Sequence, residues 1–233
     1  MPTRRKAPAA PKSNAGTAEA IRKILLTAGE DLDKSDEGQI LAMGEAAVAP
    51  LIELLGDESL LEDDAPGEGM APCHAAWLLG LLHAESAIEP LLDAVVDESA
   101  SGLLRCNAAM QALSELGAVV LDPVLRRLKD VSIDARIYLC EILGRLGVQD
   151  PRILKQLLAL LKESPEVGAA CLVDYGDKAA LPSLNAALDA CKPTAGASAF
   201  ENGAIVELYE AIEELGGKPT PAQRAKYALA ASK

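Results

Sequence analysis

The chain has 233 residues, half of them apolar and only 3% aromatic, with 22 basic and 35 acidic side chains and a net charge of −13. A core of this composition must be built from Leu, Ala, Val and Ile, and the dominance of good helix formers predicts an all-α fold. The acidic balance argues against nucleic-acid and anionic-membrane partners, because both are recognised by neutralising phosphates with basic side chains.

The charge is unevenly distributed along the chain. Residues 1–16, MPTRRKAPAAPKSNAG, carry +4 and are typical of a disordered basic arm. No hydrophobic segment follows this basic start, and no apolar run reaches the roughly 18 to 20 residues that span a bilayer, so we expect a cytoplasmic protein. Residues 17–104 carry −16, residues 105–162 carry +3 and residues 163–233 carry −4.

A repeated pattern follows an expected lead-in helix at about 17–28. Six times, a glycine-class residue at a helix end precedes, by four to seven residues, a proline and an apolar helix. Glycine supplies a left-handed residue at a helix C-terminus, and proline is tolerated in a first helical turn. The glycine-class positions are Gly44, His83, Gly117, Gly147, Gly176 and Gly216, and the prolines are Pro50, Pro90, Pro123, Pro151, Pro182 and Pro221.

This period holds one pair of helices, and no pair can bury its apolar face alone, so we expect the pairs to stack. First helices are predicted near 36–43, 71–82, 103–116, 133–146, 165–175 and 201–215. Second helices are predicted near 48–56, 86–98, 119–130, 151–163, 178–191 and 219–231. Two long connections interrupt the series, one with the acidic loop 57–68 and one at 191–203.

The stretch RIYLCEILGRLGVQDPRILKQLLALL, from Arg136 to Leu161, resembles a HEAT-like repeat of the short, bilin-lyase-type class. The resemblance implies a right-handed α-α superhelix, a HEAT-like solenoid of about six helix pairs plus the N-terminal lead-in helix, in one domain over 17–233. HEAT-like folds include bilin lyase subunits, alkylpurine glycosylases, an iron hydroxylase and many scaffolds, so the resemblance implies a fold rather than an activity.

The reactive side chains form no recognisable constellation. Cys73, Cys106, Cys140 and Cys171 recur at 31 to 34 residues inside first helices, a pattern that indicates core residues, and no CxxC is present. His74 and His83 are nine residues apart, which does not place them on one helical face. Repeated His-Glu pairs, which the hydroxylase branch needs, are absent. We therefore expect no catalytic residue, no metal site and no cofactor.

Second helices line the concave face of a HEAT-type stack, so their polar sides are the candidate surface. Two clusters of opposite charge appear there, and the candidate partner-binding residues are Arg126, Arg127, Lys129, Arg152, Lys155, Glu89, Asp93 and Asp97. One interpretation is that neighbouring helices neutralise each other through weak surface ion pairs. The other is a bipolar surface whose charges orient a bound protein or peptide.

The sequence thus predicts a non-enzymatic scaffold or adaptor that binds another protein or a peptide segment on its concave face. The alternative is an enzyme or lyase subunit that holds a small anionic, bilin-like ligand at the basic central repeats. A deep closed pocket around Arg126 and Arg152 would favour the ligand, whereas a shallow open groove would favour the adaptor. The oligomeric state is left open.

Overall fold

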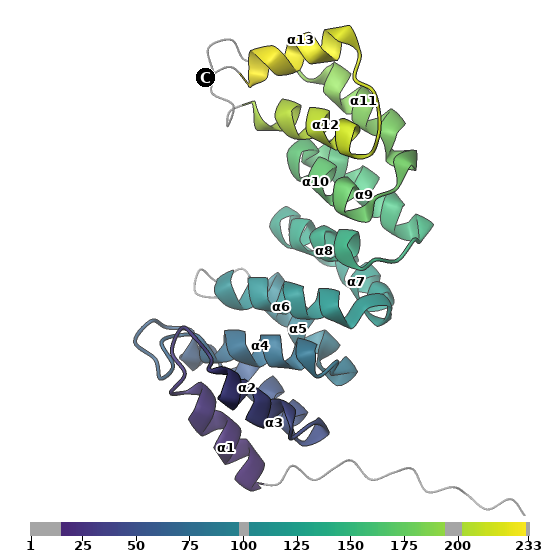
Figure 1. The fold of residues 1–233 in the computed structure, drawn as a ribbon. Helices are drawn as coiled ribbons and strands as arrows, with labels where there is room; N and C mark the ends of the chain where they lie inside the picture. The colour runs from purple at the N-terminus through teal and green to yellow at the C-terminus, as the bar shows by residue number, and fades with distance from the viewer. Residues whose placement is uncertain (1–14, 98–102, 194–201, 232–233) are drawn as a thin grey trace, which may run out of the picture. The chain divides into compact units, whose positions relative to one another are not determined.

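The computed structural model describes residues 15–97, 103–193 and 202–231, and within these ranges it contains helices and turns but no β-strand. The all-α prediction is confirmed. The chain divides into two compact units, Met1–Leu116 and Gly117–Lys233. Each unit is built from helices that pack on their neighbours along the chain (Figure 1).

Unit 1 is centred on helix α4, which packs between α3 and α6. Helix α5 lies against α6 and α3, while α1 packs on α3 and α2 touches α4. Short 3₁₀ turns, η1 (Glu58–Leu60) and η2 (Glu85–Ala87), precede α4 and α5. The helices are α1 (Ala15–Leu25), α2 (Lys34–Leu41), α3 (Glu45–Leu55), α4 (Ala71–Leu81), α5 (Ile88–Val96) and α6 (Leu103–Leu116).

Unit 2 is centred on helix α10, which contacts α8, α9 and α12. Helix α11 lies against α12 and α9, and α13 closes the unit by packing on α12. Its helices are α7 (Leu121–Arg127), α8 (Ile133–Arg145), α9 (Pro151–Glu163), α10 (Pro165–Tyr175), α11 (Leu181–Ala190), α12 (Gly203–Glu214) and α13 (Pro221–Ala230), with the 3₁₀ turns η4 (Gly117–Val120), η5 (Leu128–Asp130) and η6 (Lys178–Ala180).

Within each unit the helices alternate as the predicted pairs require. First helices contact the next first helix, α4 with α6 and α8 with α10 and then α12. Second helices contact the next second helix, α3 with α5 and α9 with α11. The predicted helix positions agree with the structure to within a few residues. A right-handed superhelix running through 17–233 stays a prediction.

All six glycine-class positions of the repeat have left-handed backbones, with φ between +48° and +79°. Five of them are glycine, but the sixth is His83, with φ +48°. This is the conformation that an L-residue adopts at a cost and glycine adopts freely. The repeat read from the sequence is therefore a repeat of backbone geometry at helix C-termini.

The prolines agree only in part with the expectation that each begins a helix. Pro151 and Pro221 are the first residues of α9 and α13, and Pro182 is the second residue of α11. Pro50 is a correction, because α3 already starts at Glu45 and the proline lies inside it. A proline at this depth removes one intrahelical hydrogen bond.

Two glycines inside first helices allow those helices to approach closely. A Cβ at Gly80 of α4 would lie 2.9 Å from Ala112 Cα of α6, and one at Gly144 of α8 would lie 2.9 Å from the Cys171 carbonyl oxygen of α10. Each glycine is three residues before the left-handed residue of its repeat. A side chain at either position would push two stacked helices apart.

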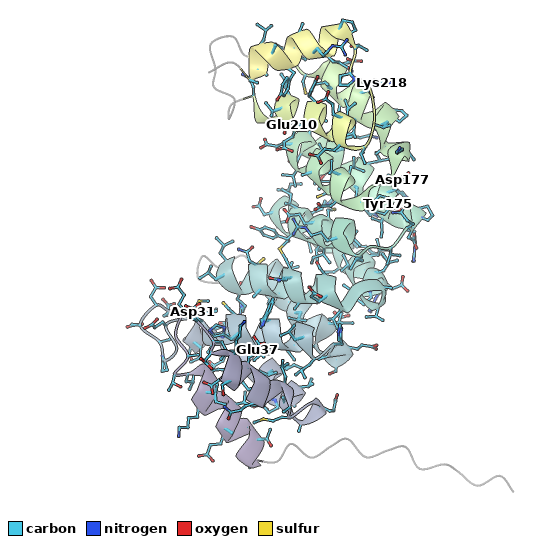
Figure 2. The ribbon with its side chains drawn as sticks, viewed as in Figure 1. Asp31, Glu37, Tyr175, Asp177, Glu210 and Lys218 are labelled. Carbon is cyan, nitrogen blue, oxygen red and sulfur yellow. The ribbon has the colours of Figure 1, made fainter. Side chains whose placement is uncertain are left out.

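Tyr175 of α10 is hydrogen-bonded to the turn that precedes α9. The Tyr175 hydroxyl donates to the Asp150 carbonyl and accepts from the Asp150 N–H, both at 3.0 Å. Gln149 in turn donates to the Tyr175 carbonyl at 3.0 Å. The label in Figure 2 places Tyr175 at the end of α10, so these bonds fix the turn between α8 and α9 against α10.

The ends of the expected domain lie partly outside the described residues. Of the predicted arm, 1–16, residues 1–14 are outside them, and α1 already begins at Ala15. Most of the connection 191–203 is also outside them.

Among the described residues, Leu103–Arg127 is long and apolar enough to cross a bilayer by length and composition. Helices α2 and α3 also pass that test if taken as one span bent by 117°. The α-helix of Leu103–Arg127 is interrupted at Gly117, whose φ is +68°. Its α6 part buries Cys106, Met110 and Leu113 and packs on α4 and α5. A buried core helix satisfies the same two criteria.

Candidate functional site: a groove on α9 and α11

An apolar hollow in unit 2 lies between the second helices α9 and α11. Its volume is about 440 Å³. The wall from α9 and the start of α10 is aliphatic, and the floor from α11 consists mainly of alanines. The lining residues are Leu158, Leu161, Lys162, Pro165, Ser183, Ala186, Ala187, Ala190 and Cys191.

A second hollow of about 450 Å³ continues along the same face of α9. It shares Leu158 and Lys162 with the first hollow, and its other lining residues are Pro151, Leu154, Lys155, Gln156 and Ala159. The two hollows therefore form one continuous surface, which we call the α9–α11 groove.

The sequence of α9 explains why its outer face is apolar. Its buried stripe uses Ile153, Leu157, Leu160 and Leu161, as an amphipathic helix requires. Leu154 and Leu158 lie one turn apart outside this stripe and are only half-buried. Because these two side chains are not part of the core, they form an apolar strip that faces solvent.

The floor of the groove is low because α11 supplies small side chains there. Leu184 and Leu188 turn inward and are buried, while Ala186 and Ala190 are exposed and Ala187 is half-buried. Methyl side chains leave space that a larger residue would fill.

All the charged side chains that line the groove are cationic. Lys155 and Lys162 are both exposed, and no carboxylate is among the lining residues. The nearby carboxylate of Glu163 is paired with Arg136 of α8, with Nη1 and Oε1 3.2 Å apart. The groove thus combines an apolar floor with a positively charged rim.

One end of the groove is anchored by the last helix of unit 2. Lys226 of α13 donates from Nζ to the carbonyls of Leu188, Asp189 and Cys191 at 2.6, 2.9 and 2.7 Å. These carbonyls end α11 and lack intrahelical donors, so the ammonium group satisfies them. Gln223, also of α13, donates to Asp189 at 3.0 Å.

Cys191 is the only one of the five cysteines that is not buried, and it lines the groove. Partial burial raises the pKa of its thiol, while the Lys226 charge opposes that rise. The other four thiols are buried, as predicted. Burial raises the pKa values of Cys140 and Cys171 to about 12 each, so both are unreactive in the folded chain.

The predicted cations of unit 2 have different surroundings. Arg126 and Arg127 occupy the last turn of α7, and Lys129 lies in η5. Lys155 lines the groove. Arg152 is held between two carboxylates, with Nη1 2.8 Å from Asp122 and Nη2 2.8 Å from Asp150. The hydrogen bonds to the Arg152 guanidinium and amide lower the pKa of Asp150.

The predicted acidic stripe belongs to unit 1. Glu89 and Asp93 are exposed on α5, whereas Asp97 ends that helix and forms an ion pair with Arg105. Arg105 is only 4% exposed and also donates to the Leu55 carbonyl at 3.3 Å. Asp97 therefore compensates a buried cation. The adjacency of the acidic and basic clusters stays a prediction.

The histidines and the tryptophan have structural surroundings. His74 is buried, with Nε2 2.9 Å from the Gly29 carbonyl oxygen, and this contact ties α4 to the loop after α1. Trp77 is half-buried and its indole donates to Glu37 at 3.4 Å. In the described ranges, no group of three or more His, Cys, Asp or Glu side chains could hold a metal ion.

Lys155 was predicted from the sequence as a partner-binding residue, but the position of the groove between α9 and α11 was not. The available signal was the run LLALL at 157–161, which is more apolar than one buried stripe requires, opposite the alanines of α11. Taken together, the described helices and the groove define an all-α protein with an apolar, cation-rimmed surface. Neither a protein-family model nor a curated protein matches this chain.

Proposed function

We propose that the protein is a non-enzymatic scaffold that binds another protein or a peptide segment on the face formed by its second helices. The observation that carries the proposal is the α9–α11 groove, which consists of one hollow between two adjacent second helices and an adjoining hollow along α9. An open apolar surface of this kind can take the apolar face of a helical segment.

The stacking of first helices on first helices within each unit supports a HEAT-like repeat as the framework of this scaffold. In such a framework the second helices form a continuous surface, and the exposed cations of α7, η5 and α9 extend the charged rim. Charge on this rim contributes to the orientation and on-rate of a partner.

The alternative is a lyase subunit that holds a small anionic ligand at Arg126 and Arg152. Against it stands the environment of Arg152, whose guanidinium is already paired with Asp122 and Asp150. A propionate or similar anion at this site would compete with two carboxylates of the protein.

Affinity capture from native lysate tests the scaffold. Reversal of Arg126, Arg127, Lys129 and Lys155 to Glu is expected to abolish capture while leaving the far-UV circular dichroism unchanged. Arg152 is left intact because its reversal would place three carboxylates together at the start of α9. The matched control reverses Lys23, Lys34, Lys178 and Lys218, four exposed lysines outside these helices. Equal capture by both variants would refute the scaffold.

A further inference from the structure

The α9–α11 groove has an apolar floor, and its charged lining consists of lysines. We propose that it binds an acidic amphipathic helix of a partner protein. This inference rests on the proposed function and adds the chemistry of the partner to it.

The shape of the groove suits a helix. Ala186, Ala187 and Ala190 lie on about one turn of α11 and keep the floor low, while Leu158 and Pro165 form a side wall. Two packed helices stand about 8–10 Å apart, and small side chains at the contact permit the closer end of that range. A partner helix can therefore place apolar side chains at i, i+3 and i+4 spacing onto the alanines.

The positive charge of the rim predicts that the partner helix is negatively charged. Lys155 and Lys162 are seven residues apart on α9, which places them about two turns and about 10 Å apart along the helix axis. A partner helix lying along α9 meets both lysines with carboxylates at the same seven-residue spacing. Opposite charges at this spacing specify the sign and the register of the bound helix.

The net charge of −13 opposes an acidic partner at long range. Salt screens such repulsion beyond about 8 Å at physiological ionic strength, so charges next to the groove dominate once the partner has docked. The carboxylates closest in sequence to Lys162 and Cys191 are engaged, Glu163 with Arg136 and Asp189 with Gln223. Lys155 and Lys162 therefore attract an acidic helix at this surface.

Selection from displayed peptides tests the sign of the partner. The library contains helical peptides of about 16 residues, a little over four turns, with a fixed apolar stripe and flanking positions randomised among Glu, Gln and Lys. Selection on the full-length protein is expected to enrich Glu at flanking positions seven apart. Enrichment of Gln or Lys would overturn the proposal, as would the absence of any enrichment.

The Cys191 thiol reports whether an enriched peptide occupies the groove. It is the only cysteine that is not buried, so its reaction with a thiol reagent at pH 8 can be followed separately from the others. A saturating peptide is expected to slow that reaction at least tenfold. An unchanged reaction rate with the peptide bound would place the peptide elsewhere and overturn the proposal.

Two variants with matched controls test the rim and the floor. Lys162→Glu is expected to weaken the binding of the Glu-containing peptide about five- to tenfold, because the sign of one rim charge is reversed. The same variant is expected to bind the Lys-containing counterpart more tightly. Lys218→Glu makes the same charge change outside the groove and should alter affinity less than twofold. Ala186→Trp fills the floor and should weaken binding at least tenfold, while Ala170→Trp, on an exposed position of α10, should not.

Failure of this inference is distinguishable from failure of the scaffold. If lysate capture needs Arg126, Arg127, Lys129 and Lys155 but is insensitive to Lys162→Glu and Ala186→Trp, the scaffold stands and the acidic-helix proposal is refuted. The opposite result is that the acidic peptides protect Cys191 while the variant with four reversed charges captures its partner as the wild type does. In that case the acidic-helix inference stands, and the proposal that the wider face of second helices binds a partner is refuted. Protection of Cys191 by dimerisation of the protein alone would assign the groove to a second copy.

Discussion

At the scale of single residues, the most informative position is His83. Five repeats end their first helix with a left-handed glycine, and one ends it with this histidine at φ +48°. A left-handed conformation costs a residue with a Cβ roughly 1–2 kcal/mol. The histidine therefore carries backbone strain at a site where its neighbours in the series carry none.

Replacing His83 with Gly is expected to stabilise the folded chain by about 0.5–1 kcal/mol. The gain is smaller than the strain because glycine also increases the entropy of the unfolded chain. Chemical denaturation followed by the fluorescence of Trp77, which lies in the same helix-turn region, measures the change.

The control is the reverse substitution at another repeat. Gly147 has φ +65°, and no atom lies within 4 Å of the Cβ that alanine would add, so Gly147→Ala tests backbone strain alone. It should destabilise the chain by about 1 kcal/mol. A destabilising His83→Gly would show that contacts of the imidazole outweigh its strain.

At the scale of elements, small residues decide how closely successive first helices stack. Gly144 of α8 faces the Cys171 carbonyl of α10, and Gly80 of α4 faces Ala112 of α6. In both cases the neighbouring atom belongs to the backbone of a helix, which cannot move independently. Any added carbon must displace a whole element.

Gly144→Ala is expected to destabilise the chain by about 1–3 kcal/mol, because its Cβ would lie 2.9 Å from a carbonyl oxygen. Gly38→Ala, in the exposed part of α2 with no atom within 4 Å, should instead stabilise it by about 0.5–1 kcal/mol through helix propensity. Urea denaturation of the two variants provides the comparison. The same sign for both would show that α8 and α10 can separate at little cost.

The helices were predictable from sequence because their ends carry local signals. Gly176 and Pro182 bracket the turn between α10 and α11, and the predicted range of α10 matches the structure at both ends. Pro50 misled the prediction, since α3 begins five residues before it. A proline cannot donate a backbone hydrogen bond, but it does not by itself mark the start of a helix.

The groove was not predictable in the same way. Periodicity assigns Leu157 and Leu161 to the core of α9, but it does not give the space left between α9 and α11 above Ala186. That space depends on how two helices far apart in the sequence pack. The pairing of Arg152 with Asp122 was hidden for the same reason, since 30 residues separate them.

At the scale of the whole molecule, one continuous stack of helix pairs over residues 17–233 stays a prediction from the sequence. A compact domain of 233 residues has a radius of gyration of about 17–18 Å. A solenoid in which each repeat contacts only its neighbours is longer and gives a larger value.

Small-angle X-ray scattering of the chain trimmed of residues 1–14 is expected to give a radius of gyration clearly above that compact value, with a long tail in the pair-distance distribution. The trimming removes the contribution of the basic arm. A radius near 17–18 Å would contradict a continuous stack and leave the two units as a compact pair.

The contacts of Lys226 have a consequence for the chemical reactivity of the protein. All three N–H donors of its ammonium group are occupied by carbonyls at the end of α11. An acylating reagent must displace that ammonium before it can attack the nitrogen, whereas Lys155 and Lys162 point into solvent. In an amine-footprinting time course, Lys226 should therefore be acylated slowly while α13 is packed against α11. Release of α13 should accelerate the acylation of Lys226.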